Sequence, residues 1–541
     1  MTGPRNHRRV VAVSAATVAG TVAATLAATT VSGVAQGAPP DDQRTSPTTS
    51  VEPYLLPSVA GVSIDSLLTV DDLPTQNGYD IVGIPDGLGA FRQDGKVVAF
   101  MNHELTDAEG ITRAHGQKGA FVSRLEIDPA SGAVTRGRDL IQEVTYWDYQ
   151  TRRYAAMPGR PDGATFGHTA AFSRFCSGYL SEPGELFNEA TERGTTRQLY
   201  FANEESGDEG RVFSVRMNGE ARQLPRLGLF SWENTVSADN TTDTTVVMGN
   251  EDGNPGQLRV YEGRKRPKGF PERRAGLTNG DLYVVDAVNE AVSTDAQFRA
   301  AFGKNTPARV SFGAGERIDW TQSGAEQNAE ALGKGLSLNR IEDGAFDPND
   351  KNDYYFLTTE GGSTAPNPQE PTISRDGGGL WRLSFDDVEQ PAQGGTLTLL
   401  LDGSEEPYLS KPDNMALDDE GNLLIQEDPG GNDHLARIVA YDIDTGERGV
   451  VARFDPALFG VSNPSGTTPD ERAVITTDEE SSGIISTDHQ FGDDTYLFDA
   501  QPHTTKGLPP GMGPGTVQEL AQRGQLMRME VGDWQAVYTI E

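Results

Sequence analysis

The sequence predicts an all-β fold, a β-propeller with short helical insertions, and three observations support this prediction. Short apolar runs alternate with Gly- and Asp-rich turns from about residue 85 onward. The 541 residues include 62 glycines and 32 prolines, a turn-rich composition that is common in all-β proteins. Helical periodicity is scarce, and the best short candidates are residues 324–334 and 516–528. Many short strands without alternating helices favour a propeller over a sandwich or an α/β fold. The sequence has no clear repeat of fixed period from which the number of blades could be predicted.

The first 38 residues are predicted to be an export signal and not part of the fold. Arg5, Arg8 and Arg9 form a basic start before a mildly apolar run, and Gly33-Val34-Ala35 offers a cleavage site. The pair Arg8-Arg9 followed by two valines favours a twin-arginine signal, with an ordinary secretory signal as the alternative. We therefore expect an exported protein, either secreted or held in the cell envelope.

The rest of the chain is predicted to be a short linker followed by one large domain. Residues 39–55 are polar and Pro-rich, which predicts a disordered linker, and residues 56–541 form a single propeller. The formal net charge is −35, so the surface should repel nucleic acid and anionic membranes. No further apolar run is long enough to span a bilayer. We therefore expect the mature protein to bind neither nucleic acid nor membranes. The sequence does not indicate the oligomeric state.

Individual strands are predicted where an apolar run lies beside a turn sequence such as Gln-Asp-Gly-Lys or Asp-Glu-Gly-Asn. The clearest examples, in chain order, are residues 97–100, 282–285, 379–383, 423–425 and 437–442. The last run, residues 534–540, is predicted to be a strand that pairs with an early strand and closes the ring.

Acidic residues recur at the ends of such apolar runs, next to Asn, Asp or Gly. The clusters are residues 102–104, 203–205, 250–252, 339–344, 412–414, 426–428 and 478–483. The inner strand of each propeller blade lines a central channel, so strand-end acids from different blades would converge there. Carboxylate and amide oxygens are ligands for hard cations. The clusters therefore predict a metal centre that is built from several blades.

Some of these side chains allow two interpretations. Arg340 and Glu342 share one face of a strand, which suits an anion clamp beside a metal ligand or, alternatively, a structural salt bridge. Glu204 and Glu205 face opposite ways, so that one of them can point to the channel. Cys176 is the single cysteine and cannot form an internal disulfide; it is either buried, which composition alone favours, or a metal ligand.

Seven short motifs occur in one order along residues 85–505: Asn102-His103-Glu104, Arg174-Phe175-Cys176-Ser177, residues 246–252, Arg340-Ile341-Glu342-Asp343, Pro412-Asp413-Asn414, residues 480–483 and residues 497–503. In this order they resemble the PhoX family of secreted, metal-dependent alkaline phosphatases. The resemblance implies a six-bladed propeller, twin-arginine export, a cluster of calcium and iron, and hydrolysis of phosphomonoesters at the mouth of the channel. It also implies that Cys176 ligates iron. The order Gln501-Pro502-His503 departs from the Gln-His-Pro of the family.

The residues and the resemblance together assign a site. The predicted metal ligands are Cys176, Glu251, Glu342, Asp413, Asn414 and Glu480, with Glu104 and Glu204 as further candidates. Arg340 is predicted to grip a phosphate oxygen, Asn414 to donate to the phosphate or ligate calcium, and His103 to orient a ligand or protonate the leaving alcohol. The predicted cofactor is Ca²⁺, with Fe³⁺ as a second metal or with calcium alone, and the predicted partner is a small phosphorylated substrate.

Two other functions fit the same acids. The chain could be a non-catalytic propeller scaffold that is stabilised by calcium between its blades, or a different calcium-dependent propeller hydrolase such as a lactonase or a phytase. A lactonase needs no anion clamp at Arg340, so the effect of Arg340→Ala would separate it from a phosphatase.

Overall fold

The computed structural model describes residues 44–164, 167–360, 377–428, 434–461, 471–504 and 523–539. The chain divides into Met1–Ala38 and Pro39–Glu541, and the propeller belongs to the second part. The predicted export signal lies outside the described residues. Among the residues that are described, no helix is both long and apolar enough to cross a membrane.

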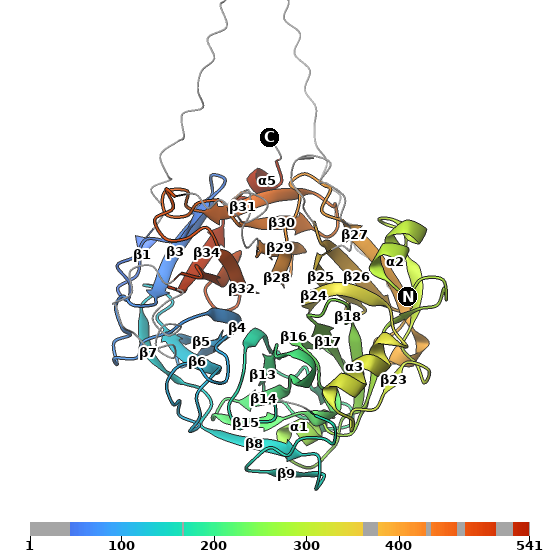
Figure 1. Ribbon diagram of the computed structural model, residues 1–541. Coiled ribbons are helices and arrows are strands. Elements are labelled where there is room, and N and C mark those ends of the chain that lie inside the picture. Colours follow the sequence, from blue (N-terminus) through green and yellow to red (C-terminus); the bar gives the residue numbers. More distant parts are fainter. Residues whose placement is uncertain are drawn as a thin grey trace, which may run out of the picture. The chain divides into compact units, whose positions relative to one another are not determined.

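The second part is an all-β propeller, which confirms the predicted fold class. Six sheets of four to seven strands are arranged around a common axis (Figure 1). Their innermost strands are β4 (Pro85–Gln93), β10 (Phe175–Leu180), β16 (Trp232–Ser237), β24 (Ser337–Phe346), β28 (Pro412–Leu417) and β32 (Glu480–Ser486). These strands contact one another in this order, and β32 contacts β4, so the ring is closed.

Each sheet continues outward from its inner strand. After β4 come β5 (Lys96–His103), β6 (Phe121–Ile127) and β7 (Val134–Asp139). After β10 come β13 (Leu199–Glu204), β14 (Val212–Arg216), β15 (Glu220–Gln223), β8 (Glu143–Asp148) and β9 (Arg153–Ala155). After β16 come β17 (Thr244–Glu251), β19 (Arg259–Arg264), β20 (Asp281–Val284) and β23 (Arg317–Ile318).

The other three sheets follow the same plan. β24 pairs with β18 (Gly256–Gln257) on one side and continues into β25 (Asp353–Glu360), β26 (Gly379–Phe385), β27 (Gly395–Leu401), β22 (Ala308–Ser311) and β21 (Asp286–Ala287) on the other. After β28 come β29 (Asn422–Glu427), β30 (Arg437–Asp442), β31 (Arg448–Phe454) and β2 (Leu55–Pro57). After β32 come β33 (Thr495–Gln501), β34 (Gln525–Val531), β3 (Val62–Thr69) and β1 (Arg44–Thr45). A separate hairpin joins β11 (Phe187–Asn188) to β12 (Arg193–Gly194).

The last sheet joins both ends of the folded part. β34 lies between β33 and β3 and is antiparallel to both, so a late strand pairs with an early one. The prediction that residues 534–540 form the closing strand is wrong, because Trp534–Val537 form the short helix α5 and β34 closes the ring. Strand β1 pairs with β3, and Ser46 and Thr48 are buried beside it, so this stretch of the predicted linker belongs to the propeller.

The helices are short. They are α1 (Pro271–Arg274), α2 (Asp295–Phe302), α3 (Gly324–Leu332) and α5, with 3-10 turns η1 (Gly207–Glu209), η2 (Pro225–Leu227) and η3 (Pro391–Gln393). The predicted helix at residues 324–334 is confirmed as α3, which begins at a capping box between Ser323 and Glu326. The predicted helix at 516–528 lies outside the described residues up to 522, and from Gln525 the chain is strand β34.

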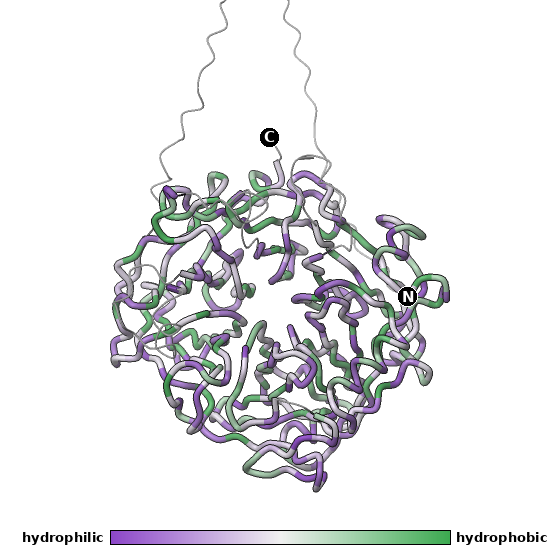
Figure 2. The backbone as a smooth tube through the Cα atoms, viewed as in Figure 1, coloured by the Kyte–Doolittle hydropathy of each residue, from purple (hydrophilic) through white to green (hydrophobic). Residues whose placement is uncertain are grey.

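Hydrophobic side chains fill the spaces between neighbouring sheets, which explains the continuous apolar runs. In β5, Val98 and Phe100 pack with side chains of the sheet that begins at β10, such as Phe213. The alternate residues Val97 and Met101 pack instead with the last sheet. Because successive side chains of a strand face opposite ways, a strand between two sheets is apolar on both faces. Figure 2 shows hydrophilic residues mainly where the sheets end, including their inner ends around the axis.

Candidate metal centre

Every inner strand carries an acidic or thiol side chain at or near a shift in its pairing with the next strand. These six side chains, called the inner ring, are Asp86, Cys176, Glu233, Glu342, Asp413 and Glu480. At or within two residues of each position, the pairing of the inner strand with the next strand shifts register. Such bulges bend a strand and re-aim its side chains. The repeated bulge is the local feature that turns the inner ring toward the axis.

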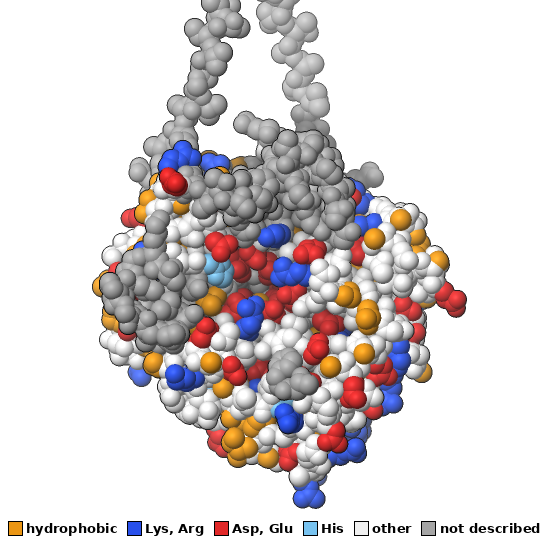
Figure 3. All heavy atoms as spheres, viewed as in Figure 1, with side chains coloured by type: hydrophobic (Ala, Val, Ile, Leu, Met, Phe, Trp, Pro, Cys, Tyr) orange, Lys and Arg blue, Asp and Glu red, His pale blue; other side chains and the backbone are white. Residues whose placement is uncertain are grey.

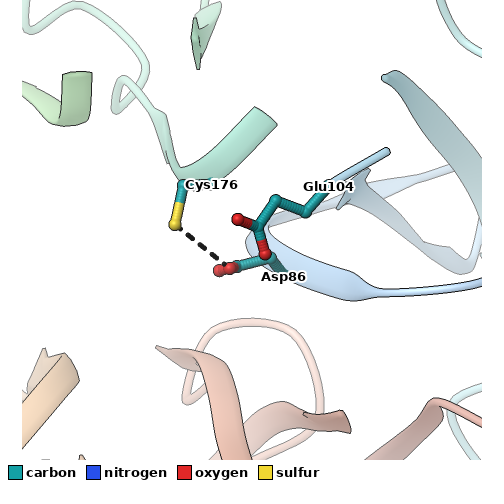
Figure 4. Close-up of side chains that lie close together, drawn as sticks. All are labelled: Asp86, Glu104 and Cys176. Carbon is teal, nitrogen blue, oxygen red and sulfur yellow. Dashed lines mark hydrogen bonds between the residues drawn. The ribbon is translucent and has the colours of Figure 1, made fainter. Parts of the chain in front are cut away.

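The ligand atoms of neighbouring side chains lie close enough to share cations. Three sets of atoms each lie within 4.8 Å of one another: Asp86, Glu104 and Cys176; Cys176, Glu205 and Glu233; and Glu233, Glu342 and Asp413. Because adjacent sets share Cys176 or Glu233, they form one continuous arc of side chains. Figure 4 shows the first set, in which Cys176 Sγ lies 3.3 Å from Asp86 Oδ2 and all three side chains point toward one another.

A second level of acids follows the second strand of four sheets. Glu104, Glu205, Asp252 and Asp428 each lie one residue beyond the end of β5, β13, β17 or β29. With His503, which follows β33, they are called the outer ring. Glu205, Asp252 and Asp428 each follow another glutamate, whose side chain points the other way. That glutamate pairs with an arginine at the start of the third strand: Glu204 with Arg211 at 2.5 Å, Glu251 with Arg259 at 2.9 Å, and Glu427 with Arg437 at 2.7 Å. Adjacent strand-end acids therefore divide into an outward structural residue and an inward site residue.

The structure brings together seven of the ten predicted site residues. Cys176, Glu342, Asp413 and Glu104 belong to the arc. Glu480 lies beside it and accepts a hydrogen bond from His503 Nε2 at 2.7 Å. The other two residues of this set, Arg340 and Asn414, contact the inner ring: Arg340 Nη2 lies 3.2 Å from Glu342 Oε1, and Asn414 Nδ2 lies 3.5 Å from Asp86 Oδ1.

The other three predicted residues lie outside the arc. Glu204 and Glu251 are the outward members of their strand ends, and their carboxylates are held in ion pairs. His103 is fully buried, with Nδ1 2.7 Å from the Val82 carbonyl and Nε2 2.8 Å from Ser123 Oγ, and its ring stacks on Phe121. Burial lowers the pKa of His103 to about 3, so its ring is neutral at physiological pH.

Sequence reasoning missed Asp86, Glu205, Glu233 and Asp252. Asp86 and Glu233 have no acidic neighbour in the sequence, so a search for paired acids passes over them. The pattern that could have found them is a single acid followed by Gly or Asn at the start of a strand, as in Asp86-Gly87, Glu233-Asn234 and Asp413-Asn414. Glu205 and Asp252 were missed because the sequence does not show which of two adjacent strand-end acids faces inward.

Two arginines stand between the rings. Arg174 Nη2 lies 2.5 Å from Glu104 Oε1 and also pairs with Glu205. Arg340 Nε lies 2.9 Å from Asp252 Oδ1 and its Nη2 reaches Glu342. Each arginine lies two residues before an inner-ring residue and has a positive φ, 49° for Arg174 and 53° for Arg340. Non-glycine residues rarely adopt this conformation, and such strain concentrates at functional sites.

Polar side chains on the second strands connect each sheet to the next around the ring. They donate hydrogen bonds to the inner-ring bulges: Asn102 to the Cys176 carbonyl at 2.6 Å, Asn203 to Asn234 at 3.4 Å, Asn250 to the Glu342 carbonyl, Thr359 to the Pro412 carbonyl at 3.1 Å, Gln426 to the Ser482 carbonyl at 3.2 Å and Gln501 to Asp86 at 3.3 Å. Each sheet thus fixes the position of its neighbour's ligand, and the circle of bonds is complete.

Burial and mutual repulsion define the electrostatics of the inner ring. Burial, and then the neighbouring carboxylates, raise the pKa of Asp86, Glu233, Glu342 and Asp413 well above the usual range. Burial likewise raises the pKa of the Cys176 thiol. Glu480 is different: against the effect of burial, the hydrogen bond from His503 holds its pKa below the usual value.

The side chains of the arc fit metal ions. Buried carboxylates that repel one another are stable as anions only with added positive charge, and Arg174 and Arg340 are too few for the acids around them. Among the described residues, Asn414 Oδ1 and both carboxylate oxygens of Asp499 are buried without a hydrogen-bond partner. Carboxylate and amide oxygens suit hard cations, and the thiolate of Cys176 suits a softer metal.

The site opens on one face of the propeller. In Figure 3, acidic side chains gather in a hollow at the centre of this face, with Lys and Arg side chains among them and a histidine at the edge. The exposed fractions of the Arg174 and Arg340 side chains are 44% and 30%, so both can meet a molecule that enters from solvent.

Comparisons with known proteins identify the family and the fold of the chain. A sequence model of the family described as alkaline phosphatase PhoX matches residues 182–486, more than half of the chain. The match includes Glu205, Glu233, Glu342, Asp413 and Glu480. No curated protein matches the chain significantly.

Among solved structures, the chain resembles PhoX of Pseudomonas fluorescens, which was determined in complex with vanadate, a transition-state analogue. The match has a TM-score of 0.59 and 13% identity over 91% of this chain and 98% of that one, which supports the shared fold. A protein of unknown function from Dyadobacter fermentans (TM-score 0.34, 9% identity, 87% and 100% of the two chains) and the periplasmic gluconolactonase of Pseudomonas aeruginosa (0.30, 12%, 72% and 87%) are far less similar. By the match of the family model, the chain belongs to the PhoX family of alkaline phosphatases.

Proposed function

We propose that this protein is an exported, metal-dependent phosphomonoesterase that acts at the arc of buried ligands. The observation that carries the proposal is the arc itself, in which three ligand sets share Cys176 and Glu233 and are flanked by two arginines. Hydrolysis of a phosphate ester requires mainly that the charge of the phosphoryl group is neutralised and that the group is held in place. A set of cations beside fixed guanidinium groups provides both.

The arc and its neighbours would hold the cations. The ligands are Asp86, Glu104, Cys176, Glu205, Glu233, Glu342, Asp413 and Glu480. Calcium suits the carboxylates, and iron would occupy the position next to the Cys176 thiolate, with a calcium-only centre as the alternative. When bound, these ions supply positive charge for the phosphate oxygens and Lewis acidity for the reaction.

Arg340 and Arg174 would hold the phosphate. Both guanidinium groups are fixed by carboxylates through Nε and Nη2. Within the described parts of the chain, neither Nη1 has a hydrogen-bond partner, so each can donate to a phosphate oxygen. Because carboxylates already hold these two arginine side chains in place, they lose little side-chain entropy when they bind phosphate.

Asn414 and His503 complete the assignment. Asn414 Nδ2 donates to Ser177 Oγ at 2.8 Å, so its unpartnered Oδ1 is the free atom, which favours cation ligation over donation to phosphate. His503 replaces His103 as the histidine of the site. Against the effect of burial, its hydrogen bond to Glu480 raises the pKa of His503 to about 9, so it carries a proton at neutral pH. Its protonated ring would donate to the leaving oxygen of the substrate.

The test combines metal analysis with turnover. The mature protein should contain calcium, with or without iron, and hydrolyse p-nitrophenyl phosphate until EGTA removes the calcium. Bound calcium without hydrolysis of any phosphomonoester would overturn the proposal in favour of a scaffold or another hydrolase. The absence of bound metal would contradict the assignment of the arc.

Variants test the roles of single residues. Arg340→Ala should lower kcat/KM by about 10- to 100-fold with metal content unchanged, because a hydrogen bond to a charged group is worth about 1.5–3 kcal/mol. Glu342→Ala should abolish turnover and lower metal content as well. Glu290→Ala, at an exposed acid without an ion pair among the described residues, is the matched control and should change neither. Normal phosphatase activity in Arg340→Ala would show that Arg340 is not the anion clamp.

A further inference from the structure

A groove on the outer edge of the propeller has a composition opposite to that of the whole chain. It has a volume of about 660 Å³ and lies where β8 and β9 meet η2, α1 and the loop before α1. Figure 1 shows β8, β9 and α1 together at the outer edge of the ring. Its lining contains four aromatic and four basic side chains and no acid, although the chain has 80 acidic and only 45 basic residues.

The basic side chains of the groove are available to a ligand. Arg266, Lys268 and Arg273 are exposed, and none of them forms an ion pair with any described residue. Arg226 donates from Nη1 to the Gly280 carbonyl at 2.7 Å, and within the described ranges no acidic side chain forms an ion pair with it. In so acidic a protein, four such cations on one groove form a local site for an anion.

The aromatic side chains form a continuous line beside these cations. Trp320 packs edge-to-face on Trp147 at 6.2 Å between ring centroids, Trp147 on Tyr154 at 5.1 Å, and Tyr154 on Phe270 at 6.0 Å. The Arg226 guanidinium lies 4.7 Å from the Trp320 ring centre and fixes that end of the line. All four residues are partly exposed, so the line offers apolar surface to solvent. The Arg222 guanidinium lies 4.6 Å from the Tyr154 ring centre and 4.3 Å from the Phe270 ring centre and covers part of these two rings.

We propose that this groove binds a nucleotide unit, with the base stacked on the aromatic line and the phosphate on the exposed cations. Proteins bind single-stranded nucleic acid through the same combination of a basic groove and stacking rings. The volume lies within the range of small-ligand sites. The net charge predicts no nucleic-acid partner, but exposed charges beyond about 8–10 Å are screened at physiological salt, so a local basic groove can act alone. The inference does not depend on the proposed phosphatase activity.

The probes are cyclic AMP and an eight-residue oligo(dT) without terminal phosphates. Neither carries a phosphomonoester, so the proposed reaction cannot consume them. Binding to the mature, metal-loaded protein is followed by tryptophan fluorescence and by calorimetry, with adenosine and sulfate as the ring-only and anion-only comparisons. Both nucleotide probes should bind more tightly than either comparison and should weaken as salt rises. Equal affinity for the two probes identifies a free nucleotide as the ligand, and much tighter oligo(dT) binding identifies a strand.

Variants separate the groove from the acidic surface. The double variant Lys268→Glu/Arg273→Glu and the single variant Trp320→Ala should each weaken binding by about tenfold or more, given the usual strength of phosphate contacts and base stacking. The matched control Lys118→Glu/Arg136→Glu reverses two exposed charges elsewhere and should leave affinity within about twofold, by the additivity of distant sites. Hydrolysis of p-nitrophenyl phosphate should be unchanged in all of them.

The inference would be overturned by no binding of either nucleotide probe, by equal binding of sulfate or adenosine, or by an equal loss of affinity in the control variant. A dimer that the groove variant dissociates, without nucleotide binding, would identify a second copy of the chain as the occupant and would also contradict it. If Trp320→Ala does not fold, the charge-reversal pair still decides the question.

Discussion

Glu204 and Glu205 are neighbours in the sequence but occupy different physical environments. The Glu204 carboxylate is buried and forms a two-point ion pair with Arg211. The Glu205 carboxylate turns toward the axis, where it meets Cys176 and Glu233. Burial and the neighbouring carboxylates raise the pKa of Glu205, although Arg174 opposes this. We therefore expect Glu204 to serve stability and Glu205 to serve the proposed metal centre.

Exchanging each of these acids for its amide should separate the two roles. Glu204→Gln leaves the buried Arg211 without a counter-charge and should lower the free energy of unfolding by about 3–5 kcal/mol, with the metal content of the folded fraction unchanged. Glu205→Gln removes a repelled charge and should leave stability nearly unchanged, while turnover falls at least about tenfold. Thermal unfolding, metal analysis and kcat/KM are measured for both variants. Loss of metal in Glu204→Gln without destabilisation would contradict this division.

For single residues, the sequence identifies where the strands end but not which of two adjacent acids faces the axis. The alternation rule says that only one of two adjacent acids can face the axis, and a shift of one residue exchanges them. The choice depends on where each strand ends and on whether an arginine begins the third strand, as Arg211, Arg259 and Arg437 do. These are tertiary contacts, so the sequence alone does not show that Glu204 and Glu251 pair with arginines while Glu342, within a bulged inner strand, lies in the arc.

At the scale of elements, β4 and β10 lie in close contact at Gly87. A Cβ atom added there would lie 2.1 Å from the Gly178 backbone nitrogen and 2.6 Å from the Cys176 carbonyl oxygen. Only glycine allows the bulge after Asp86 to sit against the bulge that holds Cys176. The distance between Asp86 and Cys176 therefore depends on residue 87 being glycine.

Gly87→Ala should separate the two strands and disturb the first ligand set. Backbone atoms cannot yield at 2.1 Å, so we expect a loss of at least about 1–3 kcal/mol in the free energy of unfolding, the usual cost of overpacking, and lower metal content and turnover. Gly315→Ala is the control, because nothing lies within 4 Å of the added atom. Denaturant unfolding and metal analysis of both variants provide the check. Equal behaviour of the two variants would show that the close approach is not required.

The sequence predicts many elements correctly because their signals are local. The turns before β5 and β29 and the capping box of α3 are each contained in a few residues. The sequence analysis placed the closing strand at residues 534–540 because their side chains are typical of strands. In the structure, two of these side chains make other contacts. Trp534 Nε1 donates to Asp494 Oδ1 at 2.6 Å and Tyr538 Oη to Asn422 Oδ1 at 2.8 Å, so these rings dock a short helix on the propeller. Ring closure depends on pairing across the whole chain, which local patterns do not contain.

On the scale of the whole molecule, the ring is held by apolar packing between sheets and opposed by repulsion at its centre. Five of the six sheets bring a carboxylate to the inner ring and the sixth brings the Cys176 thiol, so negative charge accumulates at one place. Without cations, these acids must bind protons in the folded protein. Bound metal would remove this conflict, because its charge stabilises the ionised carboxylates and its binding adds to the stability of the fold.

The stability of the metal-free protein should therefore fall as pH rises. Burial raises the pKa of Asp86, Glu233, Glu342 and Asp413 above the usual value, and that of Asp428 to about 7. Between the ordinary carboxylate pKa of about 4 and these raised values, the folded state binds more protons than the unfolded state, so the free energy of unfolding decreases with pH. Metal-stripped protein in metal-free buffer should show a lower Tm at pH 8 than at pH 5. Added calcium should raise the Tm at pH 8 far more than at pH 5, because cations replace the protons that the acids have lost. A Tm of the stripped protein that rises with pH, or calcium stabilisation that is equal at both pH values, would mean that the inner ring is not the metal-binding centre.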